Sequence, residues 1–173
     1  METLFDILKI VLPALIVFAT AYYLLKQLTD NQVRLQAMKQ QSDRSAVTLP
    51  LRLQAYERLS LFCERIAIEN LLLRVKAQGM NAGQYKVALL IAIQQEFEHN
   101  VTQQVYVSNQ LWQIIQIARD DLSRFIDLVS EKVDRTASAA EFAEQLLAYA
   151  AQRDENPLPS ARAAIQKEAG SLF

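Results

Sequence analysis

The residues best suited to chemistry lie in the segment EFEHN (96–100), which holds the only histidine of the chain. Glu96 and His99 are three residues apart, so on a helix both side chains lie on one face, as in the Glu-x-x-His pairs of di-iron bundles. A di-iron centre needs a second such pair, which a chain with one histidine cannot supply. A mononuclear metal site stays open, with the candidate ligands Glu96, Glu98 and His99 and a carboxylate from a neighbouring helix, Glu57 or Glu64.

The same segment also fits a purely structural role. Carboxylates at the end of a helix are commonly neutralised by arginines, because a buried charge needs a partner. The arginines that could pair with this segment are Arg58, Arg65 and Arg74.

Other patterns of catalytic residues are missing from the sequence. It has no glycine-rich phosphate loop, no Cys-x-x-Cys pair and no second histidine to activate a serine or cysteine. The single cysteine, Cys63, lies in the apolar run LSLFCERI and is expected to be a small core residue. The basic residues lack the interleaved aromatics of a nucleic-acid-binding surface. We therefore expect a protein that is not an enzyme, holds no cofactor and has no nucleic-acid partner.

The segment KIVLPALIVFATAYYLLK (9–26) is predicted to be a membrane helix. Its uncharged residues, 10–25, would form a helix of about 24 Å, and residues 4–28 would cover the ~30 Å core of a bilayer. Lysines at both ends would reach the two interfaces, a tyrosine pair would lie in the headgroup layer, and membrane helices tolerate a proline. These anchor residues are Lys9, Pro13, Tyr22, Tyr23 and Lys26.

Two alternatives for this segment are a cleaved signal peptide and a buried helix. The small-x-small triplet ATA (19–21) fits a cleavage site, but the acidic start METLFD lacks the basic residues of a signal peptide. A buried helix of a globular domain normally has a polar face, and residues 10–25 offer hardly any polar side chain for one. Residues 1–28 are therefore predicted to be a retained transmembrane anchor.

The charges on either side of the anchor predict its orientation. Glu2 and Asp6 precede it, whereas the charged residues that follow are mostly basic: Lys26, Arg34, Lys39, Arg44 and Arg52, with Asp30 and Asp43 between them. Because the positive flank stays in the cytoplasm, the amino terminus is expected outside and the bulk of the chain in the cytoplasm. Residues 29–47 are polar and form a stalk or linker, and their sequence leaves open whether they are helical.

Residues 48–155 are predicted to fold as an antiparallel bundle of four to five helices, so that the fold class is all-α. Thr48 and Pro50 suit the start of its first helix, in which an apolar stripe recurs at spacings of three and four. That stripe consists of Tyr56, Leu59, Phe62, Cys63 and Ile66. A short apolar run at 70–75 and a glycine-containing break at 76–84 follow.

Capping residues mark the helices that come next. Asn81 and Gln84 form a capping box for a helix over 82–104, which is apolar on most sides and is expected to be the most buried one. Ser108 caps the next helix, the fourth, and the row of apolar residues along that helix, its seam, is expected to pack within the bundle. Ser138 and Glu141 form a capping box that opens a fifth helix, which runs to about residue 153. The fourth-helix seam consists of Leu111, Ile115, Ala118, Leu122, Phe125 and Val129. Residues 156–173 are predicted to be a helical tail that is punctuated by Pro157 and Pro159.

Three stretches of the bundle carry a family resemblance: 49–66 (LPLRLQAYERLSLFCERI), 70–75 (NLLLRV) and 96–112 (EFEHNVTQQVYVSNQLW). They resemble an uncharacterised family of small single-pass membrane proteins from the Bacteroidota lineage. The resemblance covers most of the chain up to about residue 112 and implies an anchor, a helical domain and a bacterial inner membrane. It implies no catalytic residues.

The function favoured by these features is that of an interaction module. A helical domain held at the cytoplasmic face of the membrane would act as an adaptor or accessory subunit of an inner-membrane assembly, with the bilayer and other inner-membrane or cytoplasmic proteins as partners. The alternatives are the metal site on Glu96, Glu98 and His99, and a structural protein that self-assembles into homo-oligomers through the fourth-helix seam. The residues expected at a partner interface are Arg52, Arg58, Arg65, Tyr106 and Trp112.

Overall fold

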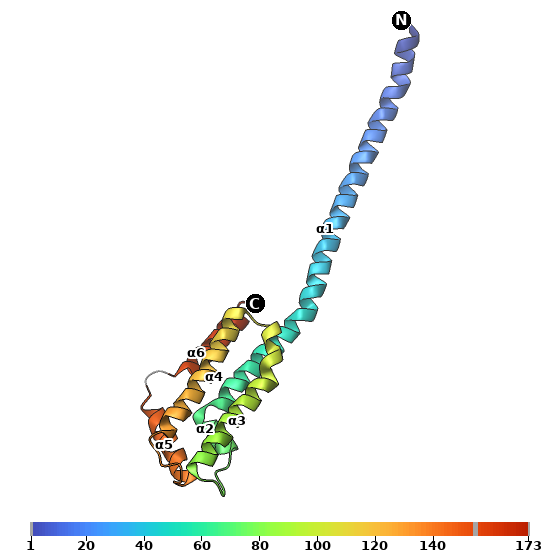
Figure 1. The fold of residues 1–173 in the computed structure, drawn as a ribbon. Helices are drawn as coiled ribbons and strands as arrows, with labels where there is room; N and C mark the ends of the chain where they lie inside the picture. The colour runs from blue at the N-terminus through green and yellow to red at the C-terminus, as the bar shows by residue number, and fades with distance from the viewer. Residues whose placement is uncertain (1, 154–155, 173) are drawn as a thin grey trace. The chain divides into compact units, whose positions relative to one another are not determined.

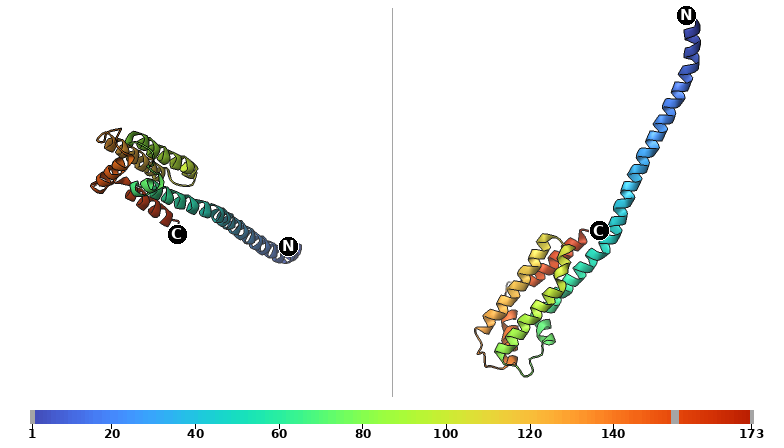
Figure 2. Two further views of the ribbon diagram at one scale, coloured as in Figure 1. Left: turned by 90° about the horizontal axis from the view of Figure 1, so that it is seen from below. Right: turned by 45° about the vertical axis from the view of Figure 1, so that its right-hand side comes forward.

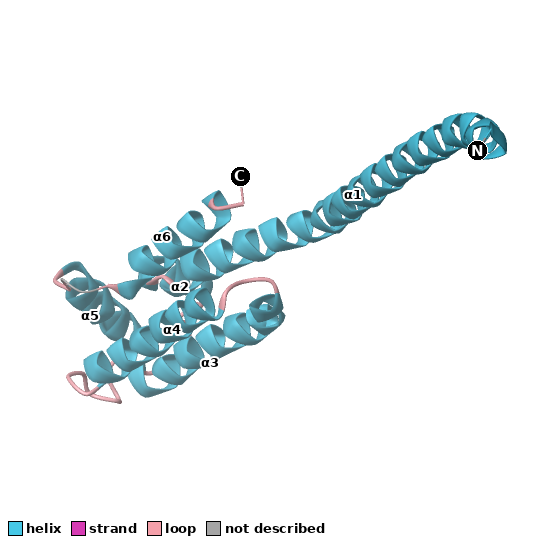
Figure 3. Cartoon of the chain, turned by 90° about the horizontal axis from the view of Figure 1, so that it is seen from above, coloured by secondary structure: helices cyan, strands magenta, loops and turns pink. Residues whose placement is uncertain are grey.

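The computed structural model describes residues 2–153 and 156–172, with side chains for 48–153, 156–172 and part of the stretch from 15 to 39. Over these residues the chain is helical and contains no strand, which confirms the all-α class (Figures 1 and 3). The elements are α1 (Glu2–Ile66), α2 (Ile68–Arg74), α3 (Ala82–Asn100), the 3-10 helix η1 (Val101–Val105), α4 (Asn109–Ser130), α5 (Ala139–Ala151) and α6 (Pro157–Gly170).

The chain divides into two compact units, Met1–Thr48 and Leu49–Phe173. Helix α1 belongs to both, so residues 29–47, whose conformation the sequence left open, are helical. The prediction of a new helix near Pro50 is wrong, since α1 runs through this residue without a break. A proline inside a helix removes one backbone hydrogen bond, but no glycine lies within α1, and the helix continues on both sides of Pro50.

The described part of the first unit exposes large apolar side chains. Within the residues whose side chains are placed, no helix contains an apolar stretch long enough to cross a membrane. Among the predicted anchor residues, Tyr22, Tyr23 and Lys26 are exposed. The side chains of Lys9 and Pro13 lie outside the described residues.

The second unit is an up-down-up-down bundle of α1, α3, α4 and α6 (Figure 2). Contacts near the two ends of each helix pair give the directions. Helices α1 and α3 are antiparallel because Arg65 binds Glu96, whereas Arg52 binds the carbonyl of Tyr106, just after η1. Helices α3 and α4 are antiparallel because Lys86 pairs with Asp127, whereas Phe97 stacks on Trp112.

Helix α6 closes the bundle by packing between α4 and α1. Its Glu168 binds Ser108 at the start of α4, while its Leu158 shares a small pocket with Leu122 farther along α4. Towards α1, Glu168 binds Tyr56, and Arg162 pairs with Glu64. Both arrangements are antiparallel, and α2 and α5 pack against each other at the end of the bundle where α1 finishes (Figure 1).

The core confirms two of the predicted apolar stripes. All five residues of the α1 stripe are buried, and in the α4 seam only Phe125 is partly exposed, with Ile126 buried beside it. The seam therefore packs within the chain, as expected. Burying a leucine or phenylalanine side chain contributes roughly 1.5–3 kcal/mol, so these stripes hold the helices together.

Helix α3 corresponds to the helix expected over 82–104, and it buries seven of its 19 residues, a larger share than α2, α4, α5 or α6, in agreement with the prediction that it is the most buried one. Its buried residues include the row Tyr85, Leu89, Ile93 and Phe97, whose spacing of four residues places the row on a single face. Val87 and Ile91 on another face are more than half exposed. Helix α3 packs against α1, α2, α4 and α5, and these neighbours leave only the face with Val87 and Ile91 uncovered.

The predicted caps are all present. The side chain of Asn81 accepts from the N–H of Gln84, and the side chain of Gln84 accepts from the N–H of Asn81. Ser108 and Ser138 cap α4 and α5. Gly79, with φ of +75°, makes the turn before α3. The helix expected over 82–104 gives way after Asn100 to η1.

The carboxyl-terminal segment differs from the expected tail. Helix α6 begins at Pro157, capped by Asn156, because proline lacks only an N–H that the first helical turn leaves unpaired. Leu158, Ala161 and Ile165 are buried, so α6 is part of the core.

Candidate functional site

Glu96 is a buried carboxylate held by two arginines from different helices. Its Oε1 accepts from Nη1 of Arg65 on α1 at 3.1 Å, and its Oε2 accepts from Nη1 of Arg74 on α2 at 2.6 Å. Burial by itself would raise the pKa of Glu96, but the hydrogen bonds from Arg74 and Arg65 and their charges outweigh it and lower the pKa. Glu96 is therefore ionised at neutral pH, and the expected pairing with Arg65 and Arg74 is confirmed. We call these three residues the Glu96 cluster.

The predicted metal ligands do not converge. Glu98 and His99 are exposed, and Oε1 of Glu98 accepts from the Gln94 amide at 2.8 Å. On the neighbouring helix Glu57 is exposed, and Glu64 pairs with Arg162 on the side of α6. Residues two apart on a helix point about 200° away from each other, which separates Glu98 from Glu96. Among the described side chains, no group of three histidine, cysteine, aspartate or glutamate residues could hold a metal ion.

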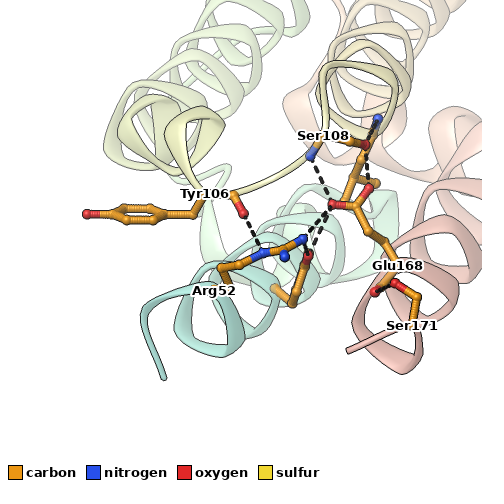
Figure 4. Close-up of polar contacts among 7 residues, drawn as sticks. Arg52, Tyr106, Ser108, Glu168 and Ser171 are labelled. Atoms are coloured by element: carbon orange, nitrogen blue, oxygen red, sulfur yellow. Dashed lines mark hydrogen bonds and ion pairs between the residues drawn. The ribbon is translucent and has the colours of Figure 1, made fainter. Parts of the chain in front are cut away.

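A second polar cluster consists of Arg52, Tyr56, Ser108 and Glu168, and we call it the Glu168 cluster (Figure 4). It joins α1, α4 and α6, and on α1 it lies more than two helical turns before Arg65. Oε1 of Glu168 accepts from the N–H of Ser108 at 2.9 Å and from the Tyr56 hydroxyl at 3.1 Å. The Ser108 hydroxyl donates to Oε2, and Nη2 of Arg52 lies 3.8 Å from Oε1. Burial would raise the pKa of Glu168, but the bonds from Ser108 and Tyr56 and the charge of Arg52 lower it.

Arg52 also fixes the turn between η1 and α4. Its Nε donates to the carbonyl of Tyr106 at 3.2 Å, and its Nη2 donates to the hydroxyl of Tyr56 at 2.8 Å. The ring of Tyr106 points away from Glu168, towards the surface (Figure 4). The structure thus brings Arg52 and Tyr106 together, two of the residues predicted at an interface.

The other residues predicted at an interface are separated. Trp112 is buried and stacks on Phe97, with ring centroids 5.4 Å apart, so its ring belongs to the core. Arg58 is exposed. Arg65 binds Glu96, but its side chain is still half exposed. Of the residues predicted at an interface, Arg58, Arg65 and Tyr106 are thus exposed, whereas Trp112 is buried.

Sequence reasoning missed Glu168 because residues 156–173 were taken as a tail. A signal was present, since Leu158, Ala161, Ile165 and Glu168 follow one another at spacings of three and four. That stripe predicts a helix packed on the bundle, with a carboxylate at one end of its buried face.

The fold defines the class of protein as a small antiparallel helical bundle preceded by a long helix. The chain belongs to a family of unknown function, DUF7935, whose profile matches residues 2–172. No curated protein and no solved structure matches it. The family match extends past residue 112, where the resemblance seen in the sequence ended, and it includes the Glu168 cluster.

Proposed function

We propose that the protein is a membrane-anchored helical interaction module that acts as an adaptor or accessory subunit of a bacterial inner-membrane assembly. In this proposal α1 crosses the bilayer with residues 4–28, and the bundle of residues 49–173 binds a partner protein in the cytoplasm.

One observation carries this proposal: a row of large apolar side chains in α1 is exposed. Their exposed fractions run from 53% to 70%. Proteins surrounded by water rarely expose a continuous apolar surface of this kind, whereas a lipid core covers it favourably at roughly 25 cal/mol per Å². The residues are Leu15, Ile16, Val17, Phe18, Tyr22, Tyr23, Leu24, Leu25 and Leu28.

The flanking charges support the orientation. Residues 26–76 carry nine lysines and arginines against five acidic residues, and they follow the apolar row directly. The acidic Glu2 and Asp6 lie on the other side. This asymmetry favours a cytoplasmic bundle.

The interaction role is supported by the contrast between buried carboxylates that pair within the bundle and exposed side chains that are available at its surface. Glu96 and Glu168 are each neutralised and hydrogen-bonded by residues of the chain itself, so both clusters hold helices together. Arg58 and the ring of Tyr106 are exposed, which suits contact with another molecule.

Cell fractionation tests the anchor. The full chain, expressed in bacteria, is expected in the membrane pellet and to resist extraction with alkaline carbonate. Val17→Asp with Leu24→Asp should release it into the soluble fraction, because a charge at the centre of a membrane helix costs about 2.5–3.5 kcal/mol. The matched control is Leu128→Asp, an equally exposed leucine on α4. Wild-type protein in the soluble fraction would contradict the proposal.

Two further measurements test the orientation and the partner. Protease added to intact spheroplasts should leave the bundle uncut and should digest it only after the membrane is opened. Cross-linking in the native host followed by detergent extraction should recover a second protein with the chain. Recovery of this chain alone would instead favour self-assembly.

A further inference from the structure

Two hollows open on either side of the Glu96 cluster. One has a volume of about 360 Å³ and is lined by Arg65 and Arg74, and the other has about 390 Å³ and is lined by Arg58 and Arg65. Arg65, Glu96 and His99 line both, so the two hollows adjoin each other at one site. Small-molecule pockets commonly have about 300–1,000 Å³, which places each hollow in that range.

The charge of this site is positive. Three guanidinium groups face a single carboxylate, which leaves an excess of two positive charges. The carboxylate is also shielded, because the Glu96 side chain is only 8% exposed whereas those of Arg65 and Arg74 are 50% and 37% exposed. An anion that enters the hollows therefore meets guanidinium groups first.

The arginines retain donors for a ligand. Nη1 of Arg65 and Nη1 of Arg74 bind Glu96, and a guanidinium has five N–H donors, so most donors of both stay available. Arg58 makes no hydrogen bond or ion pair with any residue that the structure describes. Arg58 and Arg65 are two helical turns apart and lie on the same face of α1.

Glu96 orients the site before any ligand arrives. By binding Arg65 and Arg74 at once, it holds two long side chains that would otherwise lose rotamer freedom when they bind an anion. The hydrogen-bonding fork of arginine matches two oxygens of a phosphate group, and the hollow lined by Arg58 and Arg65 offers two such forks from one face of α1.

We propose that the hollow lined by Arg58 and Arg65 binds a phosphate group carried by a small organic molecule or a lipid headgroup, with these two arginines as its ligands and Glu96 holding Arg65 in place. His99 lies at the rim and adds a nitrogen donor. Every residue of this site lies within 49–173, so the inference does not depend on the proposed membrane anchor.

Calorimetric titration of the detergent-solubilised full chain with inorganic phosphate tests the site. Arg58→Gln should weaken binding about tenfold, the loss expected from one charge-assisted hydrogen bond. This variant should fold normally because Arg58 has no partner among the described residues, and Trp112 fluorescence during unfolding checks this. Arg124→Gln on α4 removes the same charge from an exposed position outside both hollows and should bind phosphate like the wild type.

A second arm distinguishes the source of the phosphate. The amount of protein bound to phosphatidylcholine vesicles is compared with the amount bound to vesicles that also contain phosphatidic acid. Because α1 would insert into both kinds of vesicle, only the difference between the two amounts reports on the phosphate site. A difference that Arg58→Gln abolishes and Arg124→Gln keeps, without binding of inorganic phosphate, supports the site with a lipid headgroup as its ligand. Absence of binding in both arms, or equal losses in the two variants, would overturn the proposal.

Discussion

Nη1 of Arg74 lies 2.6 Å from Oε2 of Glu96, and this contact attaches the short helix α2 to the middle of the bundle. The other oxygen of the same carboxylate binds Arg65, so a single side chain of α3 links three helices. Helix α2 has only seven residues and is too short to be stable by itself, so it depends on such tertiary contacts.

Replacing Glu96 with alanine is expected to lower the free energy of unfolding by about 1–3 kcal/mol, because two charge-assisted hydrogen bonds are lost. Arg65 and Arg74 are partly exposed and can be hydrated, which limits the cost. Urea unfolding followed by the fluorescence of Trp112, the only tryptophan, measures the change. The exposed neighbour Glu98→Ala should stay within about 0.5 kcal/mol of the wild type. Equal costs for the two variants would show that the cluster contributes nothing.

Acid should weaken the bundle through Glu96 and Glu168. The pKa of each is lowered in the folded state, from an ordinary value of 4.5. A lowered pKa contributes stability above 4.5 that is lost as the pH falls through the folded pKa. The free energy of unfolding of the wild type should therefore decline below about pH 4.5. The double variant Glu96→Gln, Glu168→Gln should decline less steeply, and an unchanged slope would contradict this assignment.

Ser108 and Glu168 should be energetically coupled. Ser108→Ala removes both the cap of α4 and the bonds to Glu168, whereas Ser138→Ala removes a cap that involves no such carboxylate. Loss of a cap alone costs about 0.5–2 kcal/mol, so Ser108→Ala should cost more than Ser138→Ala. A double-mutant cycle with Glu168→Ala should give a coupling of about 0.5–3 kcal/mol. Additive costs would mean that α6 docks independently of the cap.

Cys63 should be protected from thiol reagents in the folded protein. Burial raises the pKa of its thiol to about 12, so the reactive thiolate is scarce at neutral pH and the sulfur is covered by the core. Alkylation at pH 8 should be at least about a hundredfold slower than in denaturant. Phe142→Ala, which removes a fully buried ring, should accelerate it by favouring opening of the bundle. Rapid labelling of the native chain would contradict the burial of Cys63.

Local features of the fold could be predicted from the sequence because they depend on residues three or four apart. The capping box of Asn81 and Gln84, the caps at Ser108 and Ser138 and the buried stripe of α1 all belong to this group. The pairing of Glu96 with Arg65 and Arg74 was also anticipated, since a carboxylate on an otherwise apolar face needs a cationic partner.

Features set by distant parts of the chain were missed. The exposure of Val87 and Ile91 depends on which helices cover α3, and periodicity within α3 carries no information about that. The role of Glu168 depends on α6 returning to both α1 and α4. The course of α1 through Pro50 is a balance between one lost hydrogen bond and the helix propensity of many neighbours, which a rule for single residues does not weigh.

The bond between Tyr56 and Glu168 joins residues 112 positions apart, and α6 supplies buried residues to the core that α1 begins. A growing polypeptide therefore cannot complete this bundle on the ribosome until its last helix has emerged from the exit tunnel. Until then the sides of α1 and α4 that pack on α6 are uncovered, and they are exposed to chaperones and to neighbouring nascent chains.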